Sequence, residues 1–207
     1  MTRAYGLILA GGEGSRLGGA RKADLRIGGV RLIVRVARQM GDGVDDLRVA
    51  SGQVAMDGFD CIRDEASAAM GPLAGIRACL HAIQKTASGD DMLVCVAVDT
   101  PFLPADYVPR LLSAAAENGA AYAAWGENIY PTNSAWRLSA LADALEDASE
   151  SAGPNAILTR LKALRVDWSA EAPLDPFANL NTLNDLIALQ RRALAPGYDR
   201  FIHRLQQ

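Results

Sequence analysis

With 207 residues, half of them hydrophobic, the chain is long enough for one α/β domain with a sizeable core. A net charge of −3 gives no indication of a general nucleic-acid binder. The three cysteines are widely spaced without a C-x-x-C pair, so neither a zinc site nor a disulfide framework is indicated. No apolar run is long enough for a membrane span, and we expect a cytoplasmic protein.

The most informative stretch lies near the start of the chain. Tyr5–Leu9 is an apolar run that predicts a buried strand, and the loop after it holds five glycines together with Arg16 and Lys22. Glycine allows backbone N–H groups to approach an anion closely. Arginine and lysine suit a polyphosphate, the first as a fork and the second as a point charge. The pattern predicts a phosphate-binding loop on an α/β fold.

Two familiar phosphate motifs do not describe this loop. A P-loop needs Ser or Thr after its lysine, whereas Ala23 follows Lys22. The dinucleotide fingerprint needs a third glycine where Leu17 stands.

Strands and helices alternate through the next part of the chain. Pro72 would stand in the first turn of a helix, where its missing N–H would be unpaired in any case. The expected elements are a helix at about Leu32–Met40, a strand at Leu47–Ala50, a short strand at Phe59–Arg63 and a helix at Pro72–Gln84.

Met92–Val98 is the most continuous apolar run and is typical of a central strand in a parallel sheet. Asp99 follows it, at the edge where α/β sheets bind ligands. One carboxylate, with phosphate oxygens and waters, is a common Mg²⁺ site. From the residues alone, Asp99 is either this metal ligand or a turn residue before Pro101.

The second half of the chain predicts further alternating elements. Thr182 and Asp185 form a capping-box pattern for the last helix. Trp125, Tyr130 and Trp136 are aromatic candidates for ligand stacking but are equally typical of core. The expected elements are a helix at Asp106–Asn118, a strand at Ala120–Trp125, helices at Ala140–Leu145 and Ala156–Leu164, a strand at Leu164–Trp168 and a helix at Leu183–Ala195.

The chain resembles the molybdenum cofactor guanylyltransferases, the MobA family. Leu9-Ala10-Gly11-Gly12, Arg16, Gly18-Gly19 and Lys22 match the family's glycine loop, and Gly11-Gly12 points to guanine rather than cytosine. Agreement extends over four blocks in the family's order, at 7–22, 64–75, 93–101 and 177–186.

The resemblance implies a fold and a domain arrangement. We expect an α/β Rossmann-like three-layer sandwich with a mostly parallel central sheet. A single nucleotidyltransferase domain would cover residues 1–207, with a nucleotide half at about 1–101, an acceptor half at about 102–196 and a tail at 197–207.

It also implies roles for particular residues. Arg16 and Lys22 would neutralise the β- and γ-phosphates, and Asp99 would hold Mg²⁺ with Asn181. The remaining implied contacts with nucleotide and acceptor are made by Leu9, Ala10, Gly11, Gly12, Asp64 and Asn179, the last of which would orient the acceptor.

The chain departs from the family pattern at several places. Leu17 replaces a Met, and Arg21 replaces the Asp before the lysine. Ala50 stands where the family has a nucleotide-contacting Asn, and residues 153–155 replace basic residues that some members place near the acceptor.

The implied reaction transfers GMP from GTP to molybdopterin-bound molybdenum and releases pyrophosphate, with Mg²⁺ as the cofactor. The implied partners are GTP, molybdopterin and molybdoenzymes or cofactor-delivery proteins, with no nucleic acid and no membrane. Two alternatives stay open: a nucleotidyltransferase that uses CTP or a sugar-phosphate acceptor, and a non-catalytic nucleotide-binding accessory protein.

Overall fold

The computed structural model describes residues 2–11, 13–14, 17–52, 54–62, 71–149 and 151–195, with side chains omitted at 13 and 14. Gly12, Arg16 and Asp64, three residues with implied contacts, lie outside these ranges. No helix within them is both long and apolar enough to cross a membrane.

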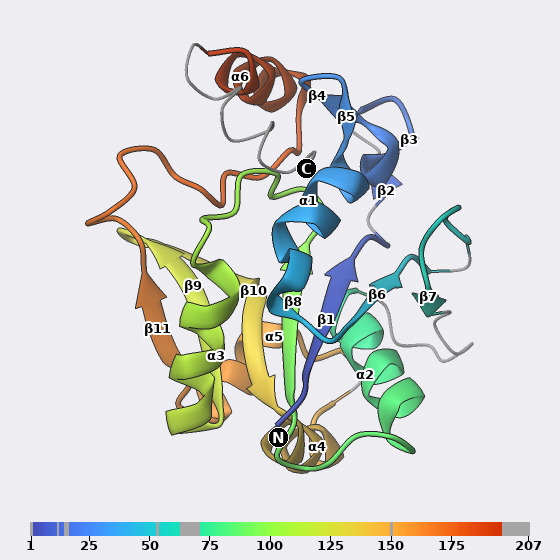
Figure 1. Cartoon of the computed structure of the whole chain (residues 1–207), viewed down its shortest axis with the longest axis vertical. Helices are drawn as coiled ribbons and strands as arrows, with labels where there is room; N and C mark the ends of the chain where they lie inside the picture. Colours follow the sequence, from blue (N-terminus) through green and yellow to red (C-terminus); the bar gives the residue numbers. More distant parts are fainter. Residues whose placement is uncertain are drawn as a thin grey trace.

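The core of the structure is a seven-stranded sheet in the order β11-β9-β10-β8-β1-β6-β7 (Figure 1). Every pairing in it is parallel except the two made by β10. The strands are β1 (Ala4–Leu9), β6 (Asp46–Ala50), β7 (Cys61–Ile62), β8 (Met92–Ala97), β9 (Ala120–Trp125), β10 (Asn128–Arg137) and β11 (Leu164–Asp167).

Helices cover both faces of this sheet. Figure 1 looks onto the sheet, with α1 and α3 in front of it and α5 behind. A short hairpin of β4 (Arg26–Ile27) and β5 (Val30–Arg31) leads into the first helix. The helices are α1 (Leu32–Met40), α2 (Pro72–Ile83), α3 (Tyr107–Asn118), α4 (Leu138–Glu146), α5 (Pro154–Arg160) and α6 (Leu183–Ala193).

Residues of β8 alternate between two cores. Val94 and Val96 face the core under α1 and α3, whereas Leu93 and Cys95 face the core under α2, α4 and α5. Because both faces are covered, the strand is apolar without a polar side. The expected three-layer α/β fold with a mostly parallel sheet is confirmed.

The predicted helix at Ala156–Leu164 has the wrong bounds. The helix α5 begins at Pro154, where proline fits the first turn, and it ends at Arg160. Lys162 then adopts a positive φ of 51°, a left-handed conformation that ends a helix. The chain is thereby free to enter β11 at Leu164.

Aromatic packing holds the irregular segment between β11 and α6. Phe177 is fully buried, and its ring lies 5.2 Å from those of Trp168 and Tyr130 and 6.0 Å from that of Tyr107. Ring pairs at these separations add to the free energy of burial. The cluster fixes the backbone two residues before Asn179.

We predict that Tyr107→Phe lowers the free energy of unfolding by about 1 kcal/mol, the net contribution of a typical hydrogen bond. The Tyr107 hydroxyl is fully buried and donates to Cys95 O at 2.6 Å, and phenylalanine keeps the ring in place. Urea unfolding of both proteins measures the difference. No loss of stability would contradict a structural role for this hydrogen bond.

Candidate functional site

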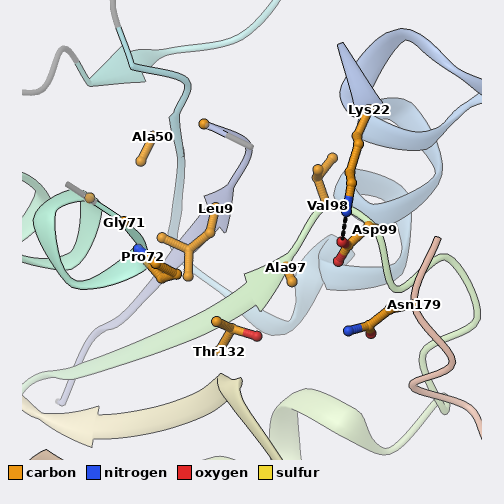
Figure 2. A pocket seen from close by; sticks show the side chains of 12 residues that line it. Leu9, Lys22, Ala50, Gly71, Pro72, Ala97, Val98, Asp99, Thr132 and Asn179 are labelled. Atoms are coloured by element: carbon orange, nitrogen blue, oxygen red, sulfur yellow. Dashed lines mark hydrogen bonds and ion pairs between the residues drawn. The ribbon is translucent and has the colours of Figure 1, made fainter. Parts of the chain in front are cut away.

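A cavity of about 300 Å³ opens at the carboxyl ends of β1 and β8. Figure 2 shows Leu9, Ala50 and Pro72 at one end of it and Lys22, Asp99 and Asn179 at the other. Its described lining residues are Leu9, Gly11, Lys22, Ala50, Gly71, Pro72, Gly75, Ala97, Val98, Asp99, Thr132 and Asn179. One end is therefore apolar and the other carries charge.

The charged end is organised by Lys22. Its Nζ donates to Asp99 Oδ2 and to Asn181 Oδ1, both at 2.6 Å. The Lys22 and Asp99 side chains are only 14% and 15% exposed, so water screens this ion pair less than it would on an open surface. Lys22 thereby contacts Asp99, 77 positions later in the chain, and Asn181, 159 positions later.

Two sets of hydrogen bonds place Asn181. Leu180 N donates to Asp99 O at 3.0 Å, which joins the segment before α6 directly to the end of β8. The capping box predicted for α6 is present: Thr182 Oγ1 accepts from Asp185 N, and Asp185 Oδ2 accepts from Thr182 N. Asp185 Oδ2 also accepts from Asn181 N at 3.0 Å.

The pKa of Asp185 lies below its ordinary value. Burial alone would raise it, but the hydrogen bonds from Asn181 N, Thr182 Oγ1 and Thr182 N favour the carboxylate, as does the Lys22 charge. Asp185 is therefore an anion at neutral pH that holds the turn carrying Asn181.

The apolar end is shaped by a missing side chain. A Cβ on Gly75 would lie 2.8 Å from Ala50 Cβ and 3.2 Å from Leu9 Cδ2, so a larger residue there would force its neighbours apart. Ala50 O accepts from Ala10 N at 2.8 Å, which holds the start of the glycine loop against β6. The alanine that replaces the family's Asn thus forms part of the cavity wall.

The glycine loop contains more structure than the sequence predicts. β2 (Glu13–Gly14) pairs with β3 (Ala20–Arg21) in an antiparallel ribbon, and a 3₁₀ turn at Lys22–Asp24 follows. Gly18 and Gly19 have φ values of 71° and 76°, which glycine adopts readily. Arg21 Nη2 forms an ion pair with Asp24 Oδ2 at 2.6 Å, so its charge contacts the loop itself.

Most of the described candidate residues gather at this one site. Leu9, Gly11, Lys22, Asp99 and Asn179 line the cavity. Asn181 joins them through Lys22, and Ala10 is buried beside them.

Sequence reasoning missed the contribution of β10. Thr132 lines the cavity, and neighbouring Asn133 is fully buried. The available signal was the polar run Thr132–Ser134 inside an otherwise apolar strand.

The three aromatic candidates are used in packing. Trp136 is fully buried, Trp125 Nε1 donates to Ala172 O at 2.9 Å, and the Tyr130 hydroxyl donates to Asp175. The described lining of the cavity includes none of the three.

A mostly parallel α/β sheet, with a glycine loop after its first strand and a Lys–Asp–Asn cluster at the strand ends, places charged and polar groups where α/β folds bind their ligands. Residues 6–166 match the family model described as "MobA-like NTP transferase domain". The chain belongs to this family and is a nucleotidyltransferase.

Full-length relatives agree with this assignment. A protein of Cereibacter sphaeroides named molybdenum cofactor guanylyltransferase is 38% identical over 189 residues, which cover 89% of this chain and 94% of the relative. One of the same name from Nitrobacter hamburgensis is 33% identical and covers 93% and 95%. The solved structure of molybdopterin-guanine dinucleotide biosynthesis protein A from Archaeoglobus fulgidus matches at a TM-score of 0.69 with 22% identity, covering 91% of this chain and 98% of that one.

We predict that Asp185→Ala lowers the free energy of unfolding at pH 7 by about 1–2 kcal/mol, because it removes a helix cap. The Asp185 pKa is lowered on folding from 3.8. Its contribution is therefore present above about pH 4 and is lost as pH falls through the folded pKa. The difference between variant and parent should narrow at pH 3.

Urea unfolding at pH 7 and pH 3 measures this difference. Asp143→Ala is the control, because Asp143 is an exposed carboxylate within α4. Its effect should stay within about 0.5 kcal/mol at both pH values. Equal losses for the two variants at pH 7 would remove the special role of Asp185.

Proposed function

We propose that this chain transfers GMP from GTP to molybdopterin-bound molybdenum cofactor and releases pyrophosphate. The observation that carries the proposal is the cluster of Lys22, Asp99 and Asn181 at the polar end of the cavity. The names of relatives that are 32–38% identical over most of the chain support the nucleotide and the acceptor.

The residues fit a magnesium site. Asp99 Oδ2 and Asn181 Oδ1 are hard oxygen donors, and both lie 2.6 Å from a single cationic atom, Lys22 Nζ. Two oxygens that converge on one positive charge can also bind a divalent cation, whose other ligands would come from phosphate and water. Asp99 and Asn181 would hold Mg²⁺, which supplies Lewis-acid stabilisation of the substrate phosphates when bound.

The reaction needs no protein base. The terminal phosphate of molybdopterin is already an anion, and its oxygen forms the new bond to the α-phosphorus of GTP. The bond from that phosphorus to the oxygen bridging to the β-phosphate breaks, and the electron pair leaves with pyrophosphate. The chain's part is to bring two polyanions together and to stabilise the leaving charge.

Lys22 meets the second need. Its ammonium and Mg²⁺ would compete for the same oxygens of Asp99 and Asn181. When Mg²⁺ and GTP are bound, Lys22 would therefore turn from Asp99 toward the β- and γ-phosphates, which are the strongest acceptors nearby. Arg16 would neutralise the same phosphates.

The rest of the cavity would select the nucleotide and orient the acceptor. Leu9, Ala10 and Gly11 would contact guanine and ribose through their backbone, with Gly12 and Asp64 as further nucleotide contacts. Gly75 lets α2 pack closely against Ala50 and Leu9, and all three residues line the apolar end where the base would lie. The acceptor would be oriented by Asn179, which lines the polar end next to Asp99.

We also propose the wider setting of this activity. One domain would cover residues 1–207, with the nucleotide half at about 1–101, the acceptor half at about 102–196 and the tail at 197–207. The enzyme would act in the cytoplasm and pass its product to molybdoenzymes or cofactor-delivery proteins.

The nucleotide is tested by thermal shift with GTP, CTP, ATP and UTP, each with and without Mg²⁺. A ligand that binds only the native state at about 100 times its Kd adds about 2.7 kcal/mol of stability. We expect GTP to raise Tm most, and more so with Mg²⁺. A larger shift with CTP would replace guanine by cytosine in the proposal.

The catalytic residues are tested by two substitutions. Asp99→Ala should lower kcat by about 10²–10³-fold, because it removes a proposed Mg²⁺ ligand and with it the stabilisation of the leaving pyrophosphate. Lys22→Ala should raise KM for GTP about tenfold or more, since a charged hydrogen bond contributes about 1.5–3 kcal/mol. Pyrophosphate release measures both, and circular dichroism checks the fold. Unchanged turnover in Asp99→Ala would exclude Asp99 from the metal site, and a normal KM in Lys22→Ala would exclude Lys22 from the phosphates.

A further inference from the structure

The end of β8 is held by a side chain of β10 where regular strand pairing stops. β10 pairs with β8 from Arg137 to Ser134, and on its other side its pairing with β9 shifts register between Ser134 and Tyr130. Val98 N donates to Leu9 O on the β1 side. Because successive amides of a strand point to opposite sides, Ala97 N points toward β10, where Asn133 Oδ1 accepts from it at 3.2 Å.

The same amide group also reaches the far end of the turn. Asn133 Nδ2 donates to Thr100 Oγ1 at 3.2 Å, and Thr100 Oγ1 donates to Ala97 O at 2.7 Å. These bonds form a closed ring that runs from Ala97 through Asn133 and Thr100 back to Ala97. Asp99 lies between Ala97 and Thr100, the two residues of this turn that the ring joins.

Burial makes this ring costly to open. Asn133 is fully buried, and Thr100 is 1% exposed. A buried polar group that loses its partner carries the full cost of its lost hydration, so the native turn is favoured over alternatives that break the ring. Removing Asn133 would leave Ala97 N without its side-chain acceptor.

We propose that Asn133 is a positioning residue that fixes the Ala97–Thr100 turn and thereby the place of the Asp99 carboxylate. The preceding residue of β10, Thr132, lines the cavity. The inference rests on the proposed function only in taking Asp99 as the metal ligand. The order of the turn is tested without it.

Three variants separate positioning from general stability. Asn133→Ala removes the hydrogen bonds from Ala97 N and to Thr100 Oγ1. Thr100→Val removes only the Thr100 hydroxyl, with little change of side-chain shape. Tyr107→Phe is the matched control, because it also removes a buried hydrogen bond to β8 but at Cys95, before the turn.

The first measurement is amide hydrogen exchange of the protein without ligands. Asn133→Ala and Thr100→Val should exchange at least about tenfold faster than the parent at residues 97–100, as local opening becomes easier. In Tyr107→Phe, the difference in exchange rate between residues 97–100 and the rest of β8 should be the same as in the parent. Protection of the turn in both ring variants equal to the parent's would overturn the inference, and so would equal loosening in Tyr107→Phe.

The second measurement is the affinity for Mn²⁺, used as a probe of the magnesium site, in the presence of GTP. Loss of a group that supports a metal ligand weakens metal binding, by up to about 10- to 100-fold where that group bonds the ligand directly; Asn133 acts one step further out, through Ala97 and Thr100. Asn133→Ala should show this loss while GTP affinity without metal stays near that of the parent. Its turnover should recover at high Mg²⁺, a recovery that an unstable protein would not show.

The two measurements distinguish an error in the proposed function from an error in the positioning role of Asn133. If the parent neither binds GTP nor releases pyrophosphate, the proposed function is wrong, and hydrogen exchange alone decides the positioning of the turn. If the parent is active and Asn133→Ala binds Mn²⁺ as Tyr107→Phe does, the positioning of Asp99 by Asn133 is wrong.

Discussion

The site depends on one cation held between two oxygens. Lys22 Nζ lies 2.6 Å from both Asp99 Oδ2 and Asn181 Oδ1, and these three residues come from the glycine loop, the end of β8 and the turn before α6. Each segment needs its own support, because long side chains lose conformational freedom when they are held in one place. Much of the structure around the cavity supplies that support.

The supports are unequal in kind. The turn before α6 is held by a capping carboxylate, Asp185, and by the bond from Leu180 N to Asp99 O. The aromatic cluster around Phe177 fixes the chain leading to it. The end of β8 is held by buried neutral groups of Asn133 and Thr100, which add no charge beside Asp99. A charged support there would change the electrostatics of the carboxylate that it holds.

Sequence patterns predicted more of the fold than of the candidate site. The unbroken apolar run before Asp99 predicts a strand covered on both faces, and the Thr182–Asp185 spacing predicts the helix cap; both are confirmed. Asp99 and Lys22 could be singled out because one follows the central strand and the other ends the glycine loop. Their direct contact could not, because sequence spacing says nothing about which side chains meet across 77 residues. The predicted end of α5 was wrong because the left-handed conformation of Lys162 cannot be inferred from the spacing of apolar residues.

Asn133 is the clearest case of information that only the fold reveals. In sequence it is the middle of the polar run Thr132–Ser134, and a buried asparagine without hydrogen-bond partners would be unfavourable. Its place is explained by the pairing of β10 with β8, which reaches Ser134 opposite Cys95; beyond that point Ala97 N takes Asn133 Oδ1 as its acceptor. A carboxamide satisfies that amide and still has a donor for Thr100, whereas a carboxylate would lack the donor and an aliphatic side chain would lack both. The end of the β10–β8 pairing and the order of the Asp99 turn are thus two parts of one arrangement.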